Sequence, residues 1–421
     1  MFLNKYSASI SNLKPVDKNN YYYVIVNVGL SAFSFLRSLV FMRNLDLRAL
    51  GIISLVQTIF MFIGLLQMGL LNGGYRIVSL GKKEDIEKTN SSIYTYVAML
   101  LPLGIVFCLL SAHFGWIKDL TLTLLLISVV FGIFTLLNNW CQNMLIGEQK
   151  LGEVNRANIV SFSMSVLTLP LAYWIGFWGA MVVIMIQPLT YVGMTIARNI
   201  ELRPSRFSFD LNYIKYILNF GFIPFLGGIF LILYLQVERW SIDSVLGVES
   251  LGAFYLVYLY VSLFQLVPTS LNSIFFPKGI KSYSEKRFGD FKRILKCYYL
   301  LLASYGVLII VVTILFLKPV VGLFFPNHLP GVNFVYIILP GLILTSLTEP
   351  IGLVLNSSVI LKPILAVSSS NMAVSVIAII SMIGLGTFSL QNVSVLRAAS
   401  GAYMFLAYII VYFIIRKKLY R

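Results

Sequence analysis

The stretch LGIISLVQTIFMFIGLLQMGLLN, residues 50–72, is apolar over almost its whole length and contains no charged residue. A helix needs about 20 mostly apolar residues to cross the hydrocarbon core of a bilayer, so this stretch is long enough to span it. A second stretch, LGAFYLVYLYVSLFQLVPTSLN at residues 251–272, opens on the same Leu-Gly pair and closes on the same Leu-Asn pair. A loop rich in Lys, Glu and Asp follows each stretch. The two stretches predict a membrane protein built from two related halves.

The rest of the chain has the same apolar character. Of its 421 residues, 58% are hydrophobic and 11% are charged, whereas soluble domains average about 45–50% apolar and about 25% charged residues. This composition predicts a polytopic membrane protein and excludes most soluble enzymes. The three cysteines show no pairing pattern and the two histidines cannot form a metal cluster alone, so neither disulfides nor a metal site are expected. No cleavable signal peptide is evident, and the first apolar run is predicted to stay in the membrane.

A window of about 20 residues finds twelve candidate spans along the chain. They are 21–42, 49–71, 91–112, 119–140, 157–175, 178–197, 217–237, 250–275, 297–317, 332–356, 363–386 and 393–415. Only a Gly/Trp turn separates 157–175 from 178–197, and one long helix there would give eleven spans. The sequence is therefore predicted to be an all-α integral membrane protein, with the span count decided by its charges.

Positive residues favour cytoplasmic loops, and their distribution supports twelve spans with both termini cytoplasmic. With the N-terminus inside, most of the 32 Lys and Arg residues fall in inner segments, whereas the outer loops contain Arg43, Arg48, Lys118, Arg239 and Lys318. Eleven spans would remove this bias from the C-terminal half. The net charge of +16 thus reflects the membrane topology and does not indicate nucleic-acid binding. The predicted parts are a tail (1–20), a six-helix bundle (21–197), a cytoplasmic connector (198–216), a second six-helix bundle (217–415) and a basic tail (416–421).

Few charged residues fall inside the predicted spans. A charge near the bilayer centre costs about 2.5–3.5 kcal/mol, so such residues usually face a cavity or a partner. Arg37 lies in the first span, at the edge of a polar stripe formed by Asn27, Ser31, Ser34 and Ser38. Arg37 either contributes to a cavity or extends its side chain to the outer interface.

The tenth span contains the carboxylate of Glu349 within a face of small and polar residues. The members of this face are Gly341, Thr345, Glu349, Gly352 and Asn356. Two prolines in the same span free backbone carbonyls, as occurs where a helix lines a water-filled cavity. Glu349 is a candidate site for a proton or Na⁺ whose gradient drives transport. The alternative is a structural ion pair with Lys362 or with another basic residue on the inner side.

Further candidates lie near the outer ends of other spans. Arg397 and the Glu238-Arg239 pair either occupy the interface or join Arg37 in a cationic vestibule that suits a pyrophosphate, because Arg binds phosphate bidentately. Glu238 is the second candidate for ion coupling. The eighth span has a polar face of Ser262, Gln265, Thr269 and Asn272, in which Gln265 and Asn272 are candidate contacts to sugar hydroxyls. Polar packing between helices explains that face equally well.

No catalytic or nucleotide-binding motif accompanies these residues. The chain has no nucleophile elbow, P-loop, HExxH or paired-carboxylate motif, so no enzyme activity and no cofactor are predicted. A motor that hydrolyses ATP is excluded on the same ground. Transport would be driven by an ion gradient or by the gradient of the substrate.

The order of these segments resembles the polysaccharide and O-antigen flippases of the multidrug/oligosaccharidyl-lipid/polysaccharide exporter superfamily, over essentially the whole chain. The matching pieces are Leu50-Gly51, the GLLNGGYR segment at 69–76, Glu238-Arg239, and the run from Leu251 to Lys278. The resemblance implies two six-helix bundles around a central cavity in a bacterial inner membrane. It implies a substrate of undecaprenyl pyrophosphate carrying an oligosaccharide repeat unit, moved to the periplasmic leaflet by alternating access. Arg37, Arg239 or Arg397 would bind the pyrophosphate.

The expected partners are this lipid-linked oligosaccharide and, in the same membrane, a polysaccharide polymerase and a chain-length regulator. Two other functions stay open. A multidrug or metabolite efflux pump of the same superfamily would prefer cavity carboxylates for organic cations, whereas arginines predominate here. A membrane-bound polymerase or ligase would resemble its relatives in having a large periplasmic loop, and every outer loop predicted here is short.

Overall fold

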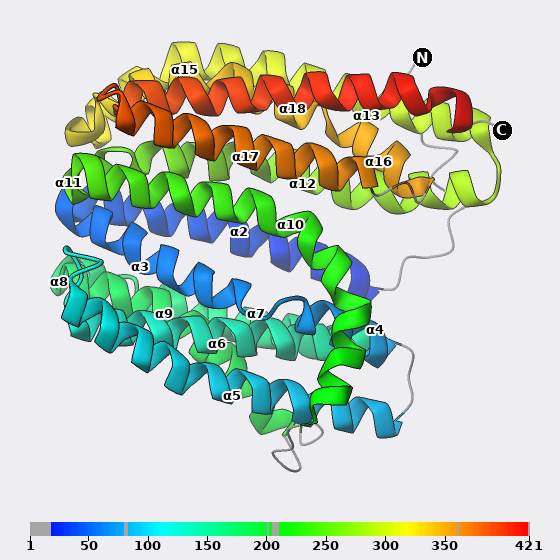
Figure 1. Ribbon diagram of the computed structural model, residues 1–421, viewed down its shortest axis with the longest axis horizontal. Coiled ribbons are helices and arrows are strands. Elements are labelled where there is room, and N and C mark those ends of the chain that lie inside the picture. The colour runs from blue at the N-terminus through cyan, green and yellow to red at the C-terminus, as the bar shows by residue number, and fades with distance from the viewer. Residues whose placement is uncertain are drawn as a thin grey trace.

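The computed structural model describes residues 18–79, 83–199, 202–203, 210–358, 360 and 362–419, and this part of the chain consists of helices and the turns between them. Two lobes of roughly parallel helices lie one above the other in Figure 1. The first lobe contains α2 (Lys18–Asn44), α3 (Leu47–Leu65), α4 (Leu70–Ser79), α5 (Lys83–Phe114), α6 (Leu122–Gly147), α7 (Leu151–Thr168), α8 (Leu171–Trp174) and α9 (Phe177–Arg198).

A long helix, α10 (Leu211–Leu246), leads into the second lobe. That lobe contains α11 (Val248–Ala253), α12 (Tyr255–Ser284), α13 (Phe288–Val312), the π-helical turn η2 (Thr313–Leu317), α14 (Lys318–Phe324), the 3₁₀ turn η3 (Pro326–His328), α15 (Gly331–Ser346), α16 (Glu349–Ser357), α17 (Lys362–Gly384) and α18 (Leu390–Leu419).

Ten helices in the described residues are long and apolar enough to cross a membrane. Helices α2 and α10 cover the two further predicted spans, 21–42 and 217–237, but are not among those ten. The chain is therefore an all-helical, multi-pass membrane protein, while twelve crossings and cytoplasmic termini stay predictions. Much of the predicted tail 1–20 and of the connector 198–216, and the end of the tail 416–421, lie outside the described residues.

Four spans that the sequence predicts as continuous are divided between two helices, namely α3 and α4, α7 and α8, α11 and α12, and α15 and α16. The first break separates α3 from α4, where Met68 (φ 48°) and Gly69 (φ 95°) adopt left-handed backbone conformations. The hydroxyl of Tyr96 donates a hydrogen bond to the carbonyl of Leu66 at this break. The last of the four breaks separates α15 from α16, immediately before Glu349. Average hydropathy cannot reveal such breaks, because the flanking residues stay apolar and another part of the protein satisfies the freed backbone groups.

The two lobes touch closely at the end where α3 and α11 begin, which is the left end in Figure 1 and the end predicted to be outer. We call it the outer end and the opposite one the inner end. A Cβ atom on Gly51 would overlap the backbone carbonyl of Val248, and a Cβ atom on Gly252 would overlap that of Leu47. Gly51 therefore packs against Val248, four residues before Gly252, and Gly252 packs against Leu47, four residues before Gly51. This reciprocal contact uses the Leu-Gly pair that the sequence repeats.

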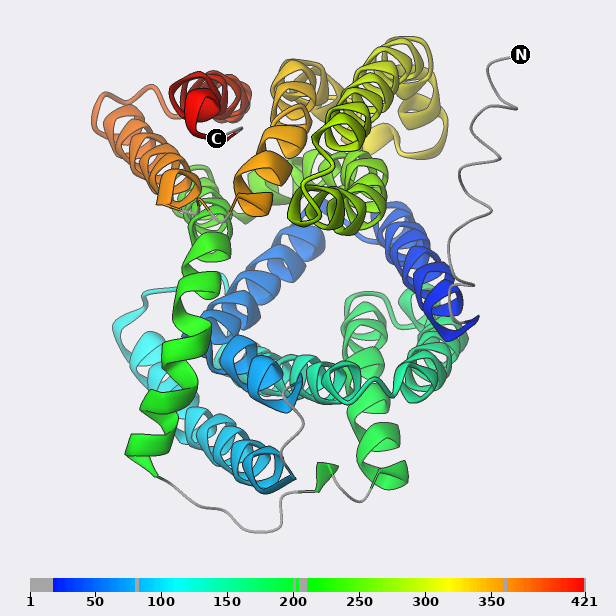
Figure 2. The same ribbon diagram turned by 90° about the vertical axis from the view of Figure 1, so that its right-hand side faces the viewer.

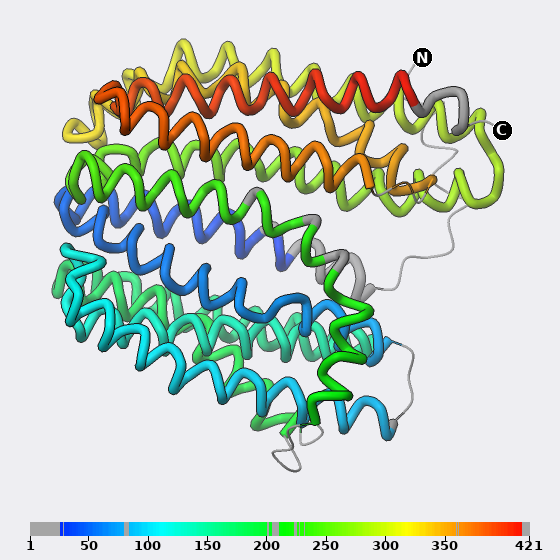
Figure 3. The backbone as a smooth tube through the Cα atoms, viewed as in Figure 1, coloured from blue at the N-terminus to red at the C-terminus, as the bar shows by residue number. Residues whose placement is uncertain are grey.

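Helix α10 crosses from one lobe to the other, as its path in Figure 2 shows. Near its start, Ile214 and Ile217 pack with Leu70 and Ile77 of α4 in the first lobe, whereas α10 also packs against α17 of the second lobe. Figure 3 follows the same helix as a tube, with its start beside α4. Helix α10 is thus the main covalent and packing link between the lobes in the described chain.

Polar contacts fix the start of α10 to α5. The Asp210 carboxylate accepts hydrogen bonds from the first backbone N–H groups of α10 and lies 3.1 Å from the ammonium of Lys88. A carboxylate at this position satisfies donors that the helix leaves free and interacts favourably with the helix dipole. The hydroxyls of Tyr213 and Thr89 lie 2.9 Å apart.

Candidate substrate cavity

A cavity of about 360 Å³ lies between the lobes, with walls from α2, α3, α10 and α12. Most of its lining residues carry polar or charged groups. The polar members are Ser31, Ser34, Arg37, Ser38, Gln57, Arg239, Tyr255, Tyr258 and Ser262, and the apolar ones are Phe35, Leu259 and Leu266. The polar stripe predicted on the first span thus supplies three of its serines to this wall. The volume falls in the range of about 300–1,000 Å³ that is typical of small-ligand sites.

Two guanidinium groups in this cavity have no counter-ion in the part of the chain that the structure describes. Arg37 donates one hydrogen bond, from Nη1 to the side-chain oxygen of Gln187 at 3.3 Å, and its Nε has no hydrogen-bond partner. The guanidinium of Arg239 lies 4.5 Å from the centre of the Tyr258 ring, and its Nε is also without a partner. Among the described residues, neither arginine forms an ion pair. These two groups therefore give the cavity a net positive charge.

A buried ion pair lies beside the cavity. Nη2 of Arg397 is 3.0 Å from Oε1 of Glu238, and the two side chains are 7% and 0% exposed. The hydroxyls of Tyr234 and Tyr258 donate to the same carboxylate at 3.3 and 3.2 Å. Three donors thus contact the Glu238 carboxylate and offset the cost of burying it. The pair joins α10 to α18 and contributes no net charge.

Tyr258 connects the ion pair to the cavity. Its ring lies 4.5 Å from the Arg239 guanidinium and 5.3 Å from that of Arg397, while its hydroxyl binds Glu238. Cations over aromatic faces are stabilised more strongly where water is excluded. Tyr258 therefore positions Arg239 in the cavity and Glu238 behind it.

The second predicted carboxylate, Glu349, lies in a separate cluster inside the second lobe. The side-chain amide of Asn272 donates to Glu349 at 3.1 Å, and the hydroxyl of Tyr298 donates to the amide oxygen of Asn272 at 3.3 Å. In the described chain no ion pair joins Glu349 to Lys362. Gly341, on the predicted face of Glu349, instead packs against the backbone of Ala398 on α18.

The structure thus divides the predicted site residues among three places. Arg37 and Arg239 share the cavity, Arg397 and Glu238 form the ion pair behind it, and Asn272 accompanies Glu349. Gln265 is exposed on α12 and does not line the cavity. No group of three or more His, Cys, Asp or Glu residues that could hold a metal ion occurs in the described ranges.

The sequence analysis did not identify the aromatic and amide residues of the cavity. Tyr255 and Tyr258 are three residues apart, and Ser262 follows four residues later, so helical spacing places all three on one face of α12. This periodicity was an available signal. The contribution of Gln187 carries no such signal, because it depends on the packing of α9 against its neighbours.

No protein-family model matches the chain, and a search of curated protein sequences finds no match. Solved structures do match its fold over nearly its whole length. An inward-facing multidrug resistance MATE family transporter of the MOP superfamily superposes with a TM-score of 0.75 at 13% identity, covering 94% of each chain. An outward-facing MATE family transporter of the same superfamily gives 0.58 at 14% identity, covering 96% of this chain and 95% of that one.

The third similar structure is that of the lipid II flippase MurJ in an inward closed conformation. Its TM-score is 0.68 at 13% identity, and the match covers 92% of this chain and 87% of that chain. At such identities the similarity shows the fold alone. The arrangement of helices is closer to the inward-facing than to the outward-facing structure. The chain therefore shares its fold with these MATE family transporters and with MurJ.

Proposed function

We propose that the protein is a flippase for undecaprenyl-pyrophosphate-linked oligosaccharide repeat units in a bacterial inner membrane. The observation that carries this proposal is the presence of two unpaired guanidinium groups, Arg37 and Arg239, in a cavity shared by both lobes. Uncompensated charge inside a membrane is costly, so such residues usually bind something. The planar fork of Arg matches phosphate oxygens, and serine and tyrosine hydroxyls nearby suit the first sugar.

The size and position of the cavity support the same substrate. A volume of about 360 Å³ accommodates a pyrophosphate and the adjoining sugar, and the rest of a repeat unit would extend toward the inner end. The lobes touch at the outer end, where α3 meets α11. Transport would then require that this contact opens after the headgroup has bound. The released unit would pass to a polymerase and a chain-length regulator in the same membrane.

The alternative proposal is an ion-coupled efflux pump for organic cations, which the fold shared with MATE transporters makes reasonable. The charges around the cavity favour the flippase. Glu238 is the nearest carboxylate of the described site, and it is occupied by Arg397 and two tyrosine hydroxyls. An organic cation entering the cavity would meet Arg37 and Arg239 without a free carboxylate.

Complementation of a strain that lacks its O-antigen flippase tests the proposal. We expect the wild-type gene to restore the lipopolysaccharide ladder on a gel, and the double variant Arg37→Ala/Arg239→Ala to fail although it reaches the membrane. Resistance to cationic dyes is measured in the same strains. Increased dye resistance without a restored ladder, in hosts that provide several different glycans, would establish the efflux alternative.

Glu349 is the proposed coupling site, because its carboxylate lies at a helix break inside one lobe and is held only by an amide in the described contacts. We predict that Glu349→Gln abolishes the dependence of transport on an imposed proton or Na⁺ gradient, since Gln keeps the shape but cannot bind and release a cation. Transport into proteoliposomes with and without each gradient measures this. Glu285→Gln, at an exposed site that follows α12, is the control and should behave as wild type. Wild-type gradient dependence in Glu349→Gln would assign the role elsewhere, with Glu238 the next carboxylate to test.

A further inference from the structure

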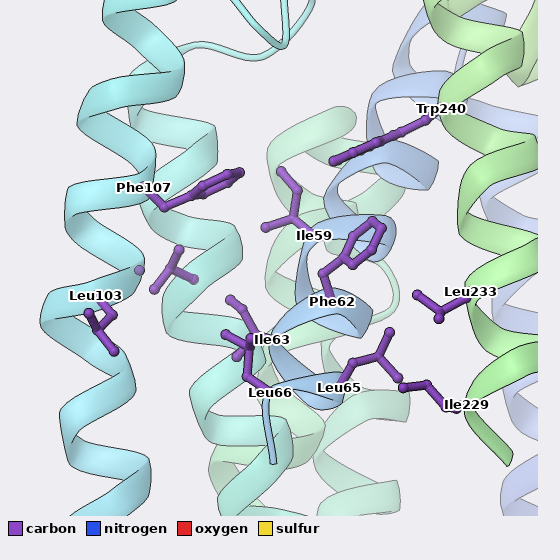
Figure 4. A pocket seen from close by; sticks show the side chains of 12 residues that line it. Ile59, Phe62, Ile63, Leu65, Leu66, Leu103, Phe107, Ile229, Leu233 and Trp240 are labelled. Atoms are coloured by element: carbon purple, nitrogen blue, oxygen red, sulfur yellow. The ribbon is translucent and has the colours of Figure 1, made fainter. Parts of the chain in front are cut away.

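A second cavity, also of about 360 Å³, lies between α3, α5, α6 and α10 and is lined almost entirely by apolar side chains. Figure 4 shows Phe107 and Trp240 facing each other across one end of it, with Leu65, Leu66 and Ile229 toward the other end. We call it the apolar groove. Its lining residues are Ile59, Phe62, Ile63, Leu65, Leu66, Leu103, Gly104, Phe107, Val129, Ile229, Leu233 and Trp240.

The apolar groove is separate from the substrate cavity although the same helices border both. On α10, Arg239 lines the substrate cavity while its neighbour Trp240 lines the groove. On α3, Gln57 likewise lines the substrate cavity while Ile59 lines the groove. Helices α3 and α10 thus form a wall with a cationic side and an apolar side.

A smaller cavity of about 280 Å³ adjoins the groove at its outer end and shares Phe107 and Trp240 with it. We call it the head pocket, and its other lining residues are Trp116, Ile117, Asp243 and Ser244. The rings of Phe107 and Trp116 lie 6.4 Å apart. The head pocket therefore combines three aromatic side chains with one carboxylate.

Asp243 is poorly satisfied in the head pocket. Its Oδ1 is buried and has no hydrogen-bond partner among the described residues. Burial, followed by the negative charges of Asp119 and Glu249, raises the pKa of Asp243 to about 6. The nearby cation, Arg48, is exposed and lies 3.5 and 3.4 Å from Asp119 and Glu249. The surroundings of Asp243 therefore favour a cation.

The length of the groove matches one leaflet of a bilayer. Its lining on α10 runs from Ile229 to Trp240, a distance of roughly 16 Å at about 1.5 Å of rise per residue. The hydrocarbon core of a membrane is about 30 Å thick. The groove thus extends over about half of the core, with the head pocket at its outer end.

We propose that the apolar groove and the head pocket together bind one phospholipid with an ammonium headgroup, of the phosphatidylethanolamine class, from the outer leaflet. One of its two acyl chains lies along the groove and its ammonium group lies among the aromatic rings beside Asp243. Ammonium groups are attracted to the faces of Trp and Phe and to carboxylates. The proposed substrate fits this site less well. Its polyprenyl pyrophosphate has no ammonium group, and the pyrophosphate would meet the carboxylates of Asp243, Asp119 and Glu249.

The bound lipid would favour contact between the lobes at the outer end. Helices α3, α5 and α6 of the first lobe and α10, which leads into the second, all contribute to the groove. A ligand that binds only when these helices are close shifts the population toward that arrangement by mass action. This lipid is therefore a regulator of outer opening and not a substrate.

Native mass spectrometry of the delipidated full-length protein, titrated with phosphatidylethanolamine or phosphatidylglycerol, tests the proposal. We expect wild type to bind phosphatidylethanolamine at least about tenfold more tightly, the factor expected for one charge-assisted contact. Asp243→Asn should lower that affinity to the level of phosphatidylglycerol. Trp240→Ala should weaken both lipids, whereas Trp178→Ala, an exposed tryptophan at the start of α9 outside the groove, should weaken neither.

Other outcomes would overturn the assignment. Equal binding of the two lipids to wild type would indicate only ordinary boundary lipid. Unchanged preference in Asp243→Asn would remove the carboxylate from the site, and displacement of phosphatidylethanolamine by undecaprenyl phosphate would assign the groove to the substrate. If Trp240→Ala unfolds, Trp240→Phe keeps the groove apolar while reducing the attraction to ammonium, and it must then lower the headgroup preference. None of these results depends on whether the flippase assay succeeds.

Discussion

Arg239→Ala and Arg37→Ala will each lower transport of a pyrophosphate-linked substrate by about one to two orders of magnitude. A hydrogen bond to a charged group contributes about 1.5–3 kcal/mol, and about 1.4 kcal/mol corresponds to a tenfold change in binding. Both guanidinium groups line the cavity without a counter-ion among the described residues, so their contacts are available to the ligand. Arg37→Lys should retain part of the activity, because Lys keeps the charge but loses the planar fork.

The measurement is the initial rate of headgroup exposure in proteoliposomes that contain the lipid-linked substrate, together with complementation in cells. Arg43→Ala is the matched control, since Arg43 is exposed near the end of the same helix as Arg37. Full activity of both Arg37→Ala and Arg37→Lys would show that Arg37 only extends toward the interface. Full activity of Arg239→Ala as well would remove the basis of the flippase proposal.

Arg397→Met will destabilise the protein by about 3–5 kcal/mol, because removing one partner of a buried ion pair leaves an uncompensated charge. The carboxylate left behind, on Glu238, is 0% exposed. The two tyrosine hydroxyls that bind Glu238 are neutral and cannot replace the guanidinium. The thermal unfolding midpoint of the purified protein, and its yield from the membrane, should both fall.

The double variant Glu238→Gln/Arg397→Met separates the loss of charge balance from the loss of packing. A neutral pair of similar size removes the buried charge, so we expect this variant to recover most of the stability lost in Arg397→Met. A double variant as unstable as Arg397→Met would show that the contacts of Arg397 with Tyr258 matter more than the charge of Glu238. Wild-type stability of Arg397→Met itself would contradict the burial of the pair.

The helical membrane fold and one part of the cavity could be predicted from the sequence. The apolar windows locate the helices because length and composition suffice to cross a bilayer, and Arg37 and Arg239 are conspicuous because charges near apolar spans are rare. The ion pair between Glu238 and Arg397 could not be predicted, because nothing in the sequence places α10 beside α18. The helix breaks beside Gly69 and Glu349 depend on backbone conformation, which hydropathy does not report.

The polar face of the eighth span shows why a predicted helix face is not yet a site. Ser262, Gln265 and Asn272 share an arc of α12, and the structure gives each a different environment. Ser262 lines the cavity, Asn272 binds Glu349 inside the second lobe, and Gln265 is exposed. A long helix meets different neighbours along its length. Helical periodicity therefore predicts the direction in which a side chain points but not the residue that it contacts.

The glycine contact at the outer end has a consequence for how the sequence can change. Gly252 meets backbone atoms of Leu47, which every amino acid provides, whereas Gly51 meets the backbone carbonyl and also a side-chain methyl group of Val248. The side chain at position 47 is therefore less constrained by this contact than the buried one at position 248, whereas a single added methyl group at either glycine would hold the lobes apart. The glycine contact thus requires small residues at positions 51 and 252 and a side chain at position 248 that fits against the first of them.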